Sequence, residues 1–310
     1  MFRNKDYILT ILREGSFTKA AEKLFISQPS LSATVKRIEE KAGVKIFDRS
    51  SSPITLTEVG EIYLKFAVEI EQKEKEFVKF LADYQNLLNG KIKIGGSSFF
   101  SSFILPNLIS NFNKEHPQIE LKIYEDSTKN LKSKLLAGEL DLILDNTNAD
   151  DDNIVKHFYA EESLLLAVPK SFEPEERYKK FTLSYEDVLQ NKHLKDVNTL
   201  PLTAFSDKPF ILLSTDNDTG RRAETLLKKH GVKPKVLFNL DQQVTAYNVC
   251  LSGLGITLVS DTLVKKLGKS NGVSYYKIGD SLALRKIYLC HKKNHYLSVA
   301  VKKFIEYYTK

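Results

Sequence analysis

A stretch near the N-terminus places an amide, a hydroxyl and two cations along one face of an expected helix. Leu31, Val35 and Ile38 have the apolar spacing of a helix that buries one side. The other side would carry small, polar or basic residues, namely Gln28, Pro29, Ser32, Ala33, Lys36 and Arg37. Such a face can approach base edges in the DNA major groove, where a glutamine amide pairs with adenine and a serine contacts either base type. Alternatively, it is an ordinary solvated surface.

A second candidate site is the run Gly95-Gly96-Ser97-Ser98. The run follows an apolar strand pattern and precedes a helix pattern, so backbone N–H groups and two hydroxyls converge where proteins often hold anions. Ser97 and Ser98 could instead cap the helix without any ligand.

The sequence lacks the motifs of common enzymes. It has no Ser/His/Asp order at a nucleophile turn, no carboxylate pair in a recognisable context and no phosphate loop. His291 and His295 flank a pattern that is typical of a strand-to-helix junction rather than of a metal-binding face. We therefore expect no catalytic residues, no bound metal, no cofactor and no enzyme activity.

The composition indicates a protein of the cytoplasm with a polyanion partner. The formal net charge is +7, and residues 1–57 hold ten Lys or Arg against six Asp or Glu. No apolar run approaches the roughly 20 residues that span a bilayer, and residues 2–13 do not resemble a signal peptide. Cys250 and Cys290 lie in apolar stretches, which favours reduced core thiols.

The first fifty residues predict three short helices that share one core. Gly15 ends the first helix, Ser16 or Thr18 can cap the second, and Ser27 can cap the third. A short hairpin follows, with strands expected at 45–47 and 54–56 around a turn-prone Ser-Ser-Ser-Pro run. This hairpin is expected to be a wing beside the third helix.

A long helix is expected from Glu58 to Leu88. Its apolar residues recur at alternating spacings of three and four, at Val59, Ile62, Tyr63, Phe66, Ile70, Phe77, Phe80, Leu81, Tyr84 and Leu88. A solitary helix cannot bury such a stripe, so we expect it to pair with the same helix of a second chain. The alternative is that it packs on the C-terminal part of its own chain.

From Gly90 onward strand and helix patterns alternate, which predicts an α/β fold with two lobes and a cleft. In lobe I we expect strands at 91–95, 119–124 and 140–144 and helices at 102–115 and 128–137. In lobe II we expect strands at 163–168, 210–213, 235–240 and 255–259 and helices at 219–229 and 241–251. A strand at 285–291 and a helix at 296–308 are expected to return to lobe I. Residues 174–207 are poorly patterned, and no role is assigned to them.

The whole chain resembles the LysR-type transcription regulators. The most specific matches are Gly15 to Leu24, Ser27 to Ser32, Gly43 to Arg49 with the preceding Glu39, and Leu56 to Gly60. Weaker matches are Leu105-Pro106 with Phe112 and His116-Pro117, then Gly138 to Asp141, and Gly253 to Ile256.

The resemblance implies a domain plan. Residues 1–57 would form a winged helix-turn-helix, 58–89 a linker and dimerisation helix, and 90–310 a periplasmic-binding-protein-like effector domain. Lobe I would comprise about 90–162 and 267–310, and lobe II about 163–266. The implied partners are double-stranded DNA, a small-molecule effector and further copies of the chain in a dimer of dimers, with RNA polymerase as a candidate partner.

The resemblance also assigns sites. DNA would be contacted by Gln28, Pro29, Ser32, Lys36, Arg37 and, on the wing, Arg49. Ala33 and the wing tip Ser51-Ser52-Pro53 depart from the family, which places Arg at the first position in many members and a basic residue at the tip. Effector contacts would be Ser97, Ser98, Phe99, Asn146, Thr147, Asn239 and Gln242.

Two features bear on the signal that the protein senses. Peroxide sensors of the family carry a reactive cysteine in the loop that here reads Asp216-Asn217-Asp218-Thr219-Gly220, so a thiol switch is disfavoured. Arg221 and Arg222 follow, and either could pair an effector carboxylate or lie on the solvated surface.

The rival functions are an enzyme or solute-binding protein of the same fold without DNA, and an architectural DNA protein with an inert C-terminal domain. The effector, the target genes and the sign of regulation do not follow from the sequence.

Overall fold

The computed structural model describes residues 2–48, 54–85, 90–146, 151–174, 176–195 and 198–309. The chain divides into two compact units, Met1–Ala82 and Asp83–Lys310. The linker helix expected from the sequence therefore falls mainly within the first unit.

The N-terminal unit starts with three short α-helices, and each begins or ends where the sequence predicts. They follow a short 3₁₀ turn, Phe2–Asn4, and are α1 Lys5–Glu14, α2 Phe17–Lys23 and α3 Gln28–Ala42. Gly15 ends α1 in the left-handed region at φ 61°. The hydroxyls of Ser16 and Ser27 accept hydrogen bonds from Lys19 N and Ser30 N, so both serines cap their helices.

The three helices share one core with the wing. Leu31, Val35 and Ile38 are buried in it, which confirms the inner face expected for α3. The wing pairs β1 Phe47–Asp48 with β2 Thr55–Leu56 in antiparallel register. Its tip, including Arg49 and Ser51-Ser52-Pro53, lies outside the described residues.

Helix α4, Glu58–Gln85, packs its first turns on this core. Tyr63 and Ala67 are buried there, and the Tyr63 ring stacks on Phe2 at a centroid distance of 4.8 Å. Lys5 Nζ lies 2.7 Å from Glu74 Oε2, and this hydrogen bond raises the pKa of the buried lysine. The helix is thus anchored to the N-terminal unit along several turns.

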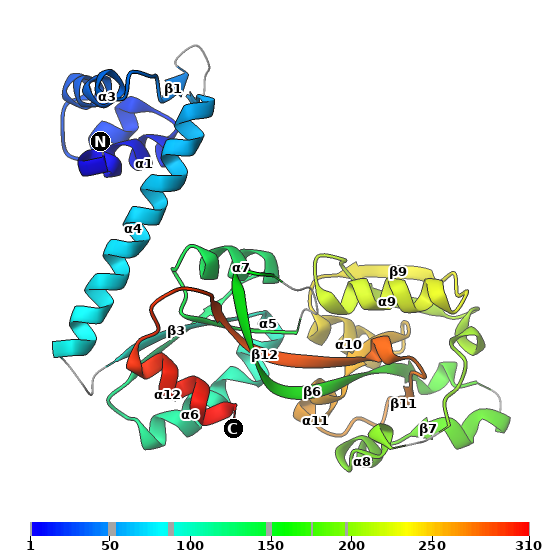
Figure 1. Ribbon diagram of the computed structural model, residues 1–310. Coiled ribbons are helices and arrows are strands. Elements are labelled where there is room, and N and C mark those ends of the chain that lie inside the picture. The colour runs from blue at the N-terminus through cyan, green and yellow to red at the C-terminus, as the bar shows by residue number, and fades with distance from the viewer. Residues whose placement is uncertain are drawn as a thin grey trace. The chain divides into compact units, whose positions relative to one another are not determined.

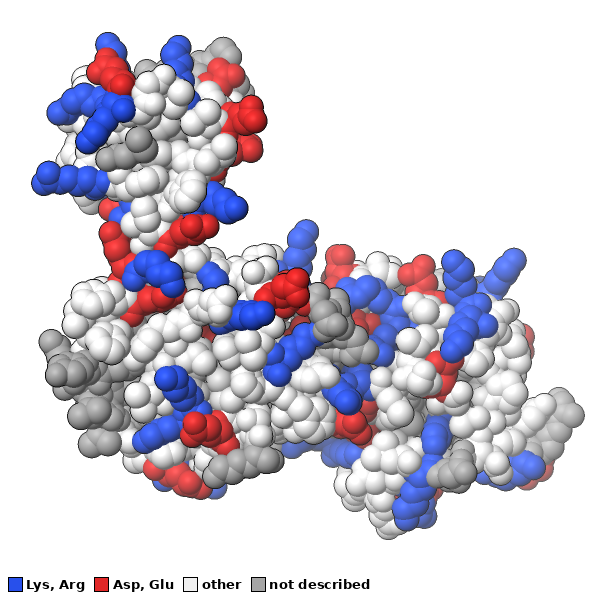
Figure 2. All heavy atoms as spheres, viewed as in Figure 1, with Lys and Arg blue, Asp and Glu red and all other residues white. Residues whose placement is uncertain are grey.

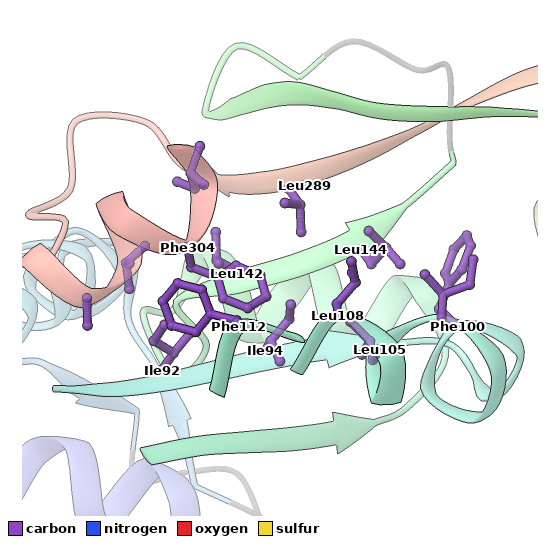
Figure 3. Close-up of a cluster of buried hydrophobic side chains, with 14 of the residues drawn as sticks. Ile92, Ile94, Phe100, Leu105, Leu108, Phe112, Leu142, Leu144, Leu289 and Phe304 are labelled. Carbon is purple, nitrogen blue, oxygen red and sulfur yellow. The ribbon is translucent and has the colours of Figure 1, made fainter. Parts of the chain in front are cut away.

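The first lobe of the second unit is a sheet covered by helices. Its strands are β3 Lys91–Gly96, β4 Glu120–Glu125 and β5 Leu142–Asp145, which are parallel, and its helices are α5 Ser98–Phe103, α6 Leu105–Glu115, α7 Thr128–Leu136 and α12 Val299–Tyr308. Figure 3 shows the core between this sheet and helices α6 and α12, with Phe112 and Phe304 facing the side chains of the strands. Helix α7 covers the other face through Leu131 and Leu135.

Two long antiparallel strands connect the lobes. They are β6 Ile154–Pro169 and β12 Leu284–Lys292, and they run side by side through the middle of the unit (Figure 1). The sequence analysis expected only the second half of β6, at 163–168, whereas the strand begins at Ile154. Residues 154–161 are half-buried or exposed, whereas Ser163–Pro169 are buried.

The second lobe wraps helices around a second sheet region. Its strands are β7 Thr182–Leu183, β8 Pro209–Leu213, β9 Lys235–Leu240, β10 Thr257–Ser260 and β11 Val273–Lys277, and its helices are α8 Tyr185–Leu189, α9 Asp218–Lys229, α10 Gln243–Leu251 and α11 Asp261–Leu267. Alternate residues of β6 enter different cores, Leu164 and Leu166 on one side and Leu165 and Ala167 on the other. The expected two-lobed α/β architecture is confirmed.

Two expectations need correction, and one stretch without a predicted element has short elements. The helix expected at 102–115 is two helices that meet at Ile104, because Pro106 has no N–H to continue the ladder from α5. The lobe boundary expected at residue 267 is too early, since β11 pairs with Leu165–Pro169 of β6 and belongs to lobe II. Residues 174–207 are not a bare loop. They carry β7, α8 and 3₁₀ turns at Glu176–Phe181, Lys192–Leu194 and Leu202–Phe205, and they bury Phe205 in the core of lobe II.

The turn between α2 and α3 contains a strained phenylalanine. Ile26 N donates to Ala21 O and Phe25 N to Glu22 O, the hydrogen bonds of a Schellman ending. Glycine usually occupies the position of Phe25, which here has φ 55° and a ring that is 95% exposed. The left-handed conformation costs a residue with a Cβ about 1–2 kcal/mol.

We expect Phe25→Gly to stabilise the protein by about 1 kcal/mol, because glycine adopts this conformation without strain. Urea unfolding of the full chain, followed by circular dichroism of the N-terminal transition, measures the change. Phe25→Ala keeps the Cβ and serves as the matched control. Equal stabilisation by both changes would show that loss of the exposed ring, not relief of strain, is responsible.

Candidate DNA-reading surface and effector cleft

Helix α3 presents the expected reading face to solvent. Gln28, Pro29, Lys36 and Arg37 are exposed and Ser32 is half-buried. Lys36 makes one weak ion pair along the helix, 3.8 Å from Glu40. Figure 2 shows basic side chains gathered on the side of the N-terminal unit where Figure 1 places α3. The exposure of Lys36 and Arg37 is what phosphate contacts would require.

Close backbone contacts fix this helix relative to the wing. Glu39 Oε1 accepts hydrogen bonds from Ile46 N at 2.8 Å and Phe47 N at 3.2 Å, which holds the start of the wing against α3. Thr57 Oγ1 donates to Lys45 O and accepts from Gly60 N, so the same hydroxyl also caps α4. A Cβ on Gly60 would lie 2.1 Å from Ile46 O, so only glycine fits. These contacts account for the residue types at three of the family-like positions.

Between the lobes lies a small cleft of about 80 Å³. Five of the expected effector residues line it, namely Ser97, Ser98, Phe99, Asn146 and Gln242. Asn239 does not line it, although its strand leads to it, and Thr147 lies outside the described residues. The sequence reasoning missed Thr128, Asn217, Asp218, Thr219, Gln243 and Arg285, which also line the cleft.

The two serines at the end of β3 do not act as caps. Ser97 is the N-cap residue of α5, but its side chain makes no capping hydrogen bond. Ser98 Oγ donates to Gln242 Oε1 at 3.1 Å, from lobe I to the residue that precedes α10 in lobe II. The cap interpretation is therefore wrong for the side chains of both residues. Ser98 instead closes the cleft with a hydrogen bond between the lobes.

A buried ion network forms the floor of the cleft. Arg285 on β12 donates from Nε to Glu162 Oε1 at 2.6 Å and from Nη1 to Thr219 Oγ1 at 2.8 Å. Its Nη1 also lies 3.2 Å from Asp218 Oδ2. Asn146 fits with Oδ1 towards this guanidinium, where it accepts hydrogen bonds at 3.2 Å. Arginine suits such a site because its fixed fork of donors can join several acceptors at once.

The two neighbouring arginines of α9 have different environments. Arg222 is buried, pairs with Asp218 at 2.6 Å and donates to Leu282 O at 2.7 Å. Arg221 is exposed and donates to the carbonyls of Thr215 and Asp216. Neither arginine lines the cleft, so neither is placed to pair an effector there.

The thiols and histidines show no sign of redox or metal chemistry. Cys250 and Cys290 are free and buried, and burial raises the pKa of each thiol to about 12. Both are therefore protonated and unreactive at neutral pH. Among the residues that the structure describes, no group of three His, Cys, Asp or Glu could hold a metal ion. Within the same residues, no helix is long and apolar enough to cross a bilayer.

Comparison with known proteins identifies the family of both parts of the chain. Residues 2–61 match the bacterial regulatory helix-turn-helix of the lysR family, and residues 85–310 match the LysR substrate binding domain. The chain is 28% identical over 303 residues to an uncharacterized HTH-type transcriptional regulator, YcgK, of Bacillus subtilis (strain 168), covering 97% of this chain and 91% of the relative.

Solved structures have the same fold. Full-length CbnR complexed with its target DNA aligns at a TM-score of 0.62 and 18% identity over 99% of this chain and 98% of that one. The regulatory domain of Synechocystis PCC6803 CcmR in complex with 2-PG aligns at 0.59 and 17% over 71% of this chain and 96% of that one. The protein belongs to the LysR family. It is a DNA-binding transcription regulator with an effector-binding domain, not an enzyme.

The geometry of α3 predicts different effects for two kinds of substitution. Gln28→Ala and Ser32→Ala should each cost about 1–3 kcal/mol chiefly at one base-pair position, the usual value of a base contact. Arg37→Ala should weaken binding to all sequences alike and lower the salt slope by about one, because one phosphate contact is lost. Fluorescence anisotropy with single-position DNA variants at several salt concentrations measures both effects. A uniform loss from Gln28→Ala would remove Gln28 from the base-reading residues.

Proposed function

We propose that a small anionic or zwitterionic metabolite binds in the cleft between the lobes and changes the geometry of the DNA-reading heads. The observation that carries this proposal is the hydrogen bond from Ser98 to Gln242, which joins the lobes directly over a polar cleft. A ligand that replaces this contact would bind both lobes at once. A regulatory domain of the same fold is solved in complex with 2-PG, which supports a bound effector in this kind of domain.

The lining favours a ligand with an anionic group. Asn217 and Gln242 precede α9 and α10, so the first turns of both helices offer N–H groups to the cleft. The hydroxyls of Ser97, Thr128 and Thr219 add further partners. Asp218 and Asp241 also line the cleft, so a cationic group on the same ligand would find a carboxylate.

The volume of the cleft limits the effector. About 80 Å³ is well below the roughly 300–1,000 Å³ of pockets for drug-sized ligands. The effector is therefore a molecule of few heavy atoms, or the lobes part when it enters. In either case the ligand acts by its difference in affinity for the two lobe arrangements.

We propose further that the protein works in the cytoplasm as a dimer of dimers. On α4 the side chains of Ile62, Phe66, Phe77 and Phe80 are 53%, 52%, 60% and 44% exposed. Such an apolar stripe on a helix favours pairing with a second copy. Strand β9 lies at an edge of its sheet and exposes Val236, Leu237 and Phe238, which gives the effector domains a second surface for assembly. We propose RNA polymerase as a further partner.

Ile62→Glu combined with Phe66→Glu should produce monomers, because each buried apolar side chain contributes about 1.5–3 kcal/mol to a dimer seam. The dimer dissociation constant should rise by about 100-fold or more. Sedimentation velocity of the full chain measures it. Ile62→Leu with Phe66→Leu keeps the apolar surface and is the matched control. If the glutamate variant keeps the native oligomer, α4 is not the seam.

Ser97→Ala combined with Ser98→Ala should weaken effector binding by about tenfold or more, since each lost hydrogen bond is worth about 1 kcal/mol. Basal DNA affinity should stay unchanged because the reading head is not altered. Thermal shift with a panel of small carboxylates and amino acids finds the effector, and DNase footprinting then measures the response to it.

Ser133→Ala with Ser206→Ala removes two hydroxyls outside the cleft and is the matched control. A Ser97/Ser98 variant that still responds fully would move the effector site elsewhere. An architectural DNA protein would show no thermal stabilisation by any member of the panel.

A further inference from the structure

Lobe II contains a second and larger cavity of about 660 Å³. It is lined mainly by residues from two stretches, 180–194 with 198–199 and the turn from Lys277 to Leu284, and it reaches β6 at Ser163. The first stretch lies wholly within residues 174–207, for which the sequence predicts no role. The volume lies within the roughly 300–1,000 Å³ of typical small-molecule sites.

Apolar side chains at the cavity remain uncovered. Leu194 and Leu284 are 53% and 55% exposed, and the half-buried ring of Phe181 also borders the space. Leu284 begins β12, at the point where the chain leaves lobe II. Apolar residues that border one cavity offer a continuous surface for the body of an organic ligand.

The charges at the cavity favour an anion. Within the described part of the chain, no carboxylate pairs with Lys180 or Lys277, and Lys277 Nζ donates to Lys195 O at 2.6 Å. Asp280 also lines the cavity, and its carboxylate is already paired with a lysine. A hydrogen bond from Lys229 at 2.7 Å, followed by one from Leu282 N, lowers its pKa to about 2.

A buried histidine in the cavity wall has an unused ring nitrogen. His193 is fully buried, and its Nε2 lies 2.9 Å from Asp261 Oδ2. Burial raises the pKa of Asp261, but hydrogen bonds from His193, Lys265 and Ser163 N outweigh it and lower the pKa to about 2. Asp261 is therefore a carboxylate, and Nε2 of His193 carries the proton. Nδ1 has no hydrogen-bond partner among the described residues. Because Nε2 carries the proton, Nδ1 is an acceptor, and it favours a hydrogen-bond donor rather than the anionic group of a ligand.

The cavity lies on the opposite side of the crossover strands from the effector cleft. Ser163 pairs with Leu284 in the ladder, and both line the cavity. The next pair is Glu162 with Arg285, whose guanidinium lines the cleft. Side chains of successive strand residues point to opposite faces, so the two spaces flank the same two strands.

Arg222 connects the wall of the cavity with the wall of the effector cleft. Arg222 donates to Leu282 O in the turn Ser281–Ala283 beside the cavity, and it pairs with Asp218 at the cleft. Asp218 in turn pairs with Arg285. A ligand that moves this turn would therefore also displace groups at the floor of the cleft.

We propose that this cavity is a second ligand site, which takes a small organic monoanion with an apolar body. The anionic group would lie near Lys180 and Lys277, and the body against Leu194 and Leu284. The site is separate from the effector cleft, so its occupation does not depend on the function proposed for Ser97 and Ser98.

Isothermal titration calorimetry of the full-length chain with hexanoate and phenylacetate tests the proposal, with hexanamide and phenylacetamide as neutral counterparts. We expect at least one carboxylate to bind saturably. Its amide should bind at least about tenfold more weakly. Lys180→Gln combined with Lys277→Gln should weaken carboxylate binding about tenfold or more, because charge-assisted contacts are lost. Ser97→Ala with Ser98→Ala should leave this binding intact.

Lys266→Gln with Lys302→Gln is the matched control, since both lysines are exposed and neither lines the cavity. Thermal unfolding and DNA affinity of each variant verify that the fold is kept. Three results would overturn the proposal. The first is that neither carboxylate binds saturably. The second is that acid and amide bind with equal affinity. The third is that the Lys180/Lys277 variant binds the carboxylate with the affinity of the unchanged protein. Binding that is lost only in the Ser97/Ser98 variant would assign the carboxylates to the effector cleft instead.

Discussion

The pairing of β6 with β12 is the constraint on which the effector domain depends. The ladder runs from Ile154 and Lys292 in lobe I to Ser163 and Leu284 at the border of lobe II. Both strands are continuous through this region, so the lobes can change their relative angle only by bending or twisting one hydrogen-bonded ribbon. The buried pair of Glu162 and Arg285 lies near the end of this ribbon. Removal of either partner would leave a buried charge uncompensated, which is strongly destabilising.

This ribbon also explains why the cleft lies beside the strands that connect the lobes. Arg285 is at once a strand residue, the partner of Asp218 on α9 and a wall of the cleft. Any ligand between the lobes therefore acts directly on the ion network that joins α9 to the ribbon. Interfaces of this kind have a few discrete arrangements, because packed side chains and paired charges do not deform continuously.

The N-terminal unit depends on a different kind of constraint, the close approach of backbones. Gly60 allows α4 to start against Ile46 O, and Glu39 bonds the backbone N–H groups at the beginning of the wing. The reading helix, the wing and α4 thus form one rigid piece. A change in the direction of the first turns of α4 would therefore carry α3 with it.

The sequence by itself determined the features that arise from contacts along a short stretch of chain. Helix α3 has its cap at Ser27, its apolar face at Leu31, Val35 and Ile38 and its polar face at Gln28 and Ser32, because helical periodicity and capping are local. The same holds for Ser97 and Ser98, which lie directly after a strand. Their partner, however, was decided by the fold, since Gln242 is 144 residues away from Ser98.

Only the tertiary structure decided which distant residues meet. Arg285 carries no local signal for a site, and its role follows from pairing with Glu162, 123 residues earlier. Likewise β11 belongs to lobe II because it pairs with β6, and residues 174–207 gain a function in packing by burying Phe205 against Tyr276. Asn239 and Gln242 show the limit of sequence reasoning. Asn239 lies within β9 and does not line the cleft, whereas Gln242 follows the end of β9 and does. Register and long-range pairing are set by the whole core rather than by local pattern.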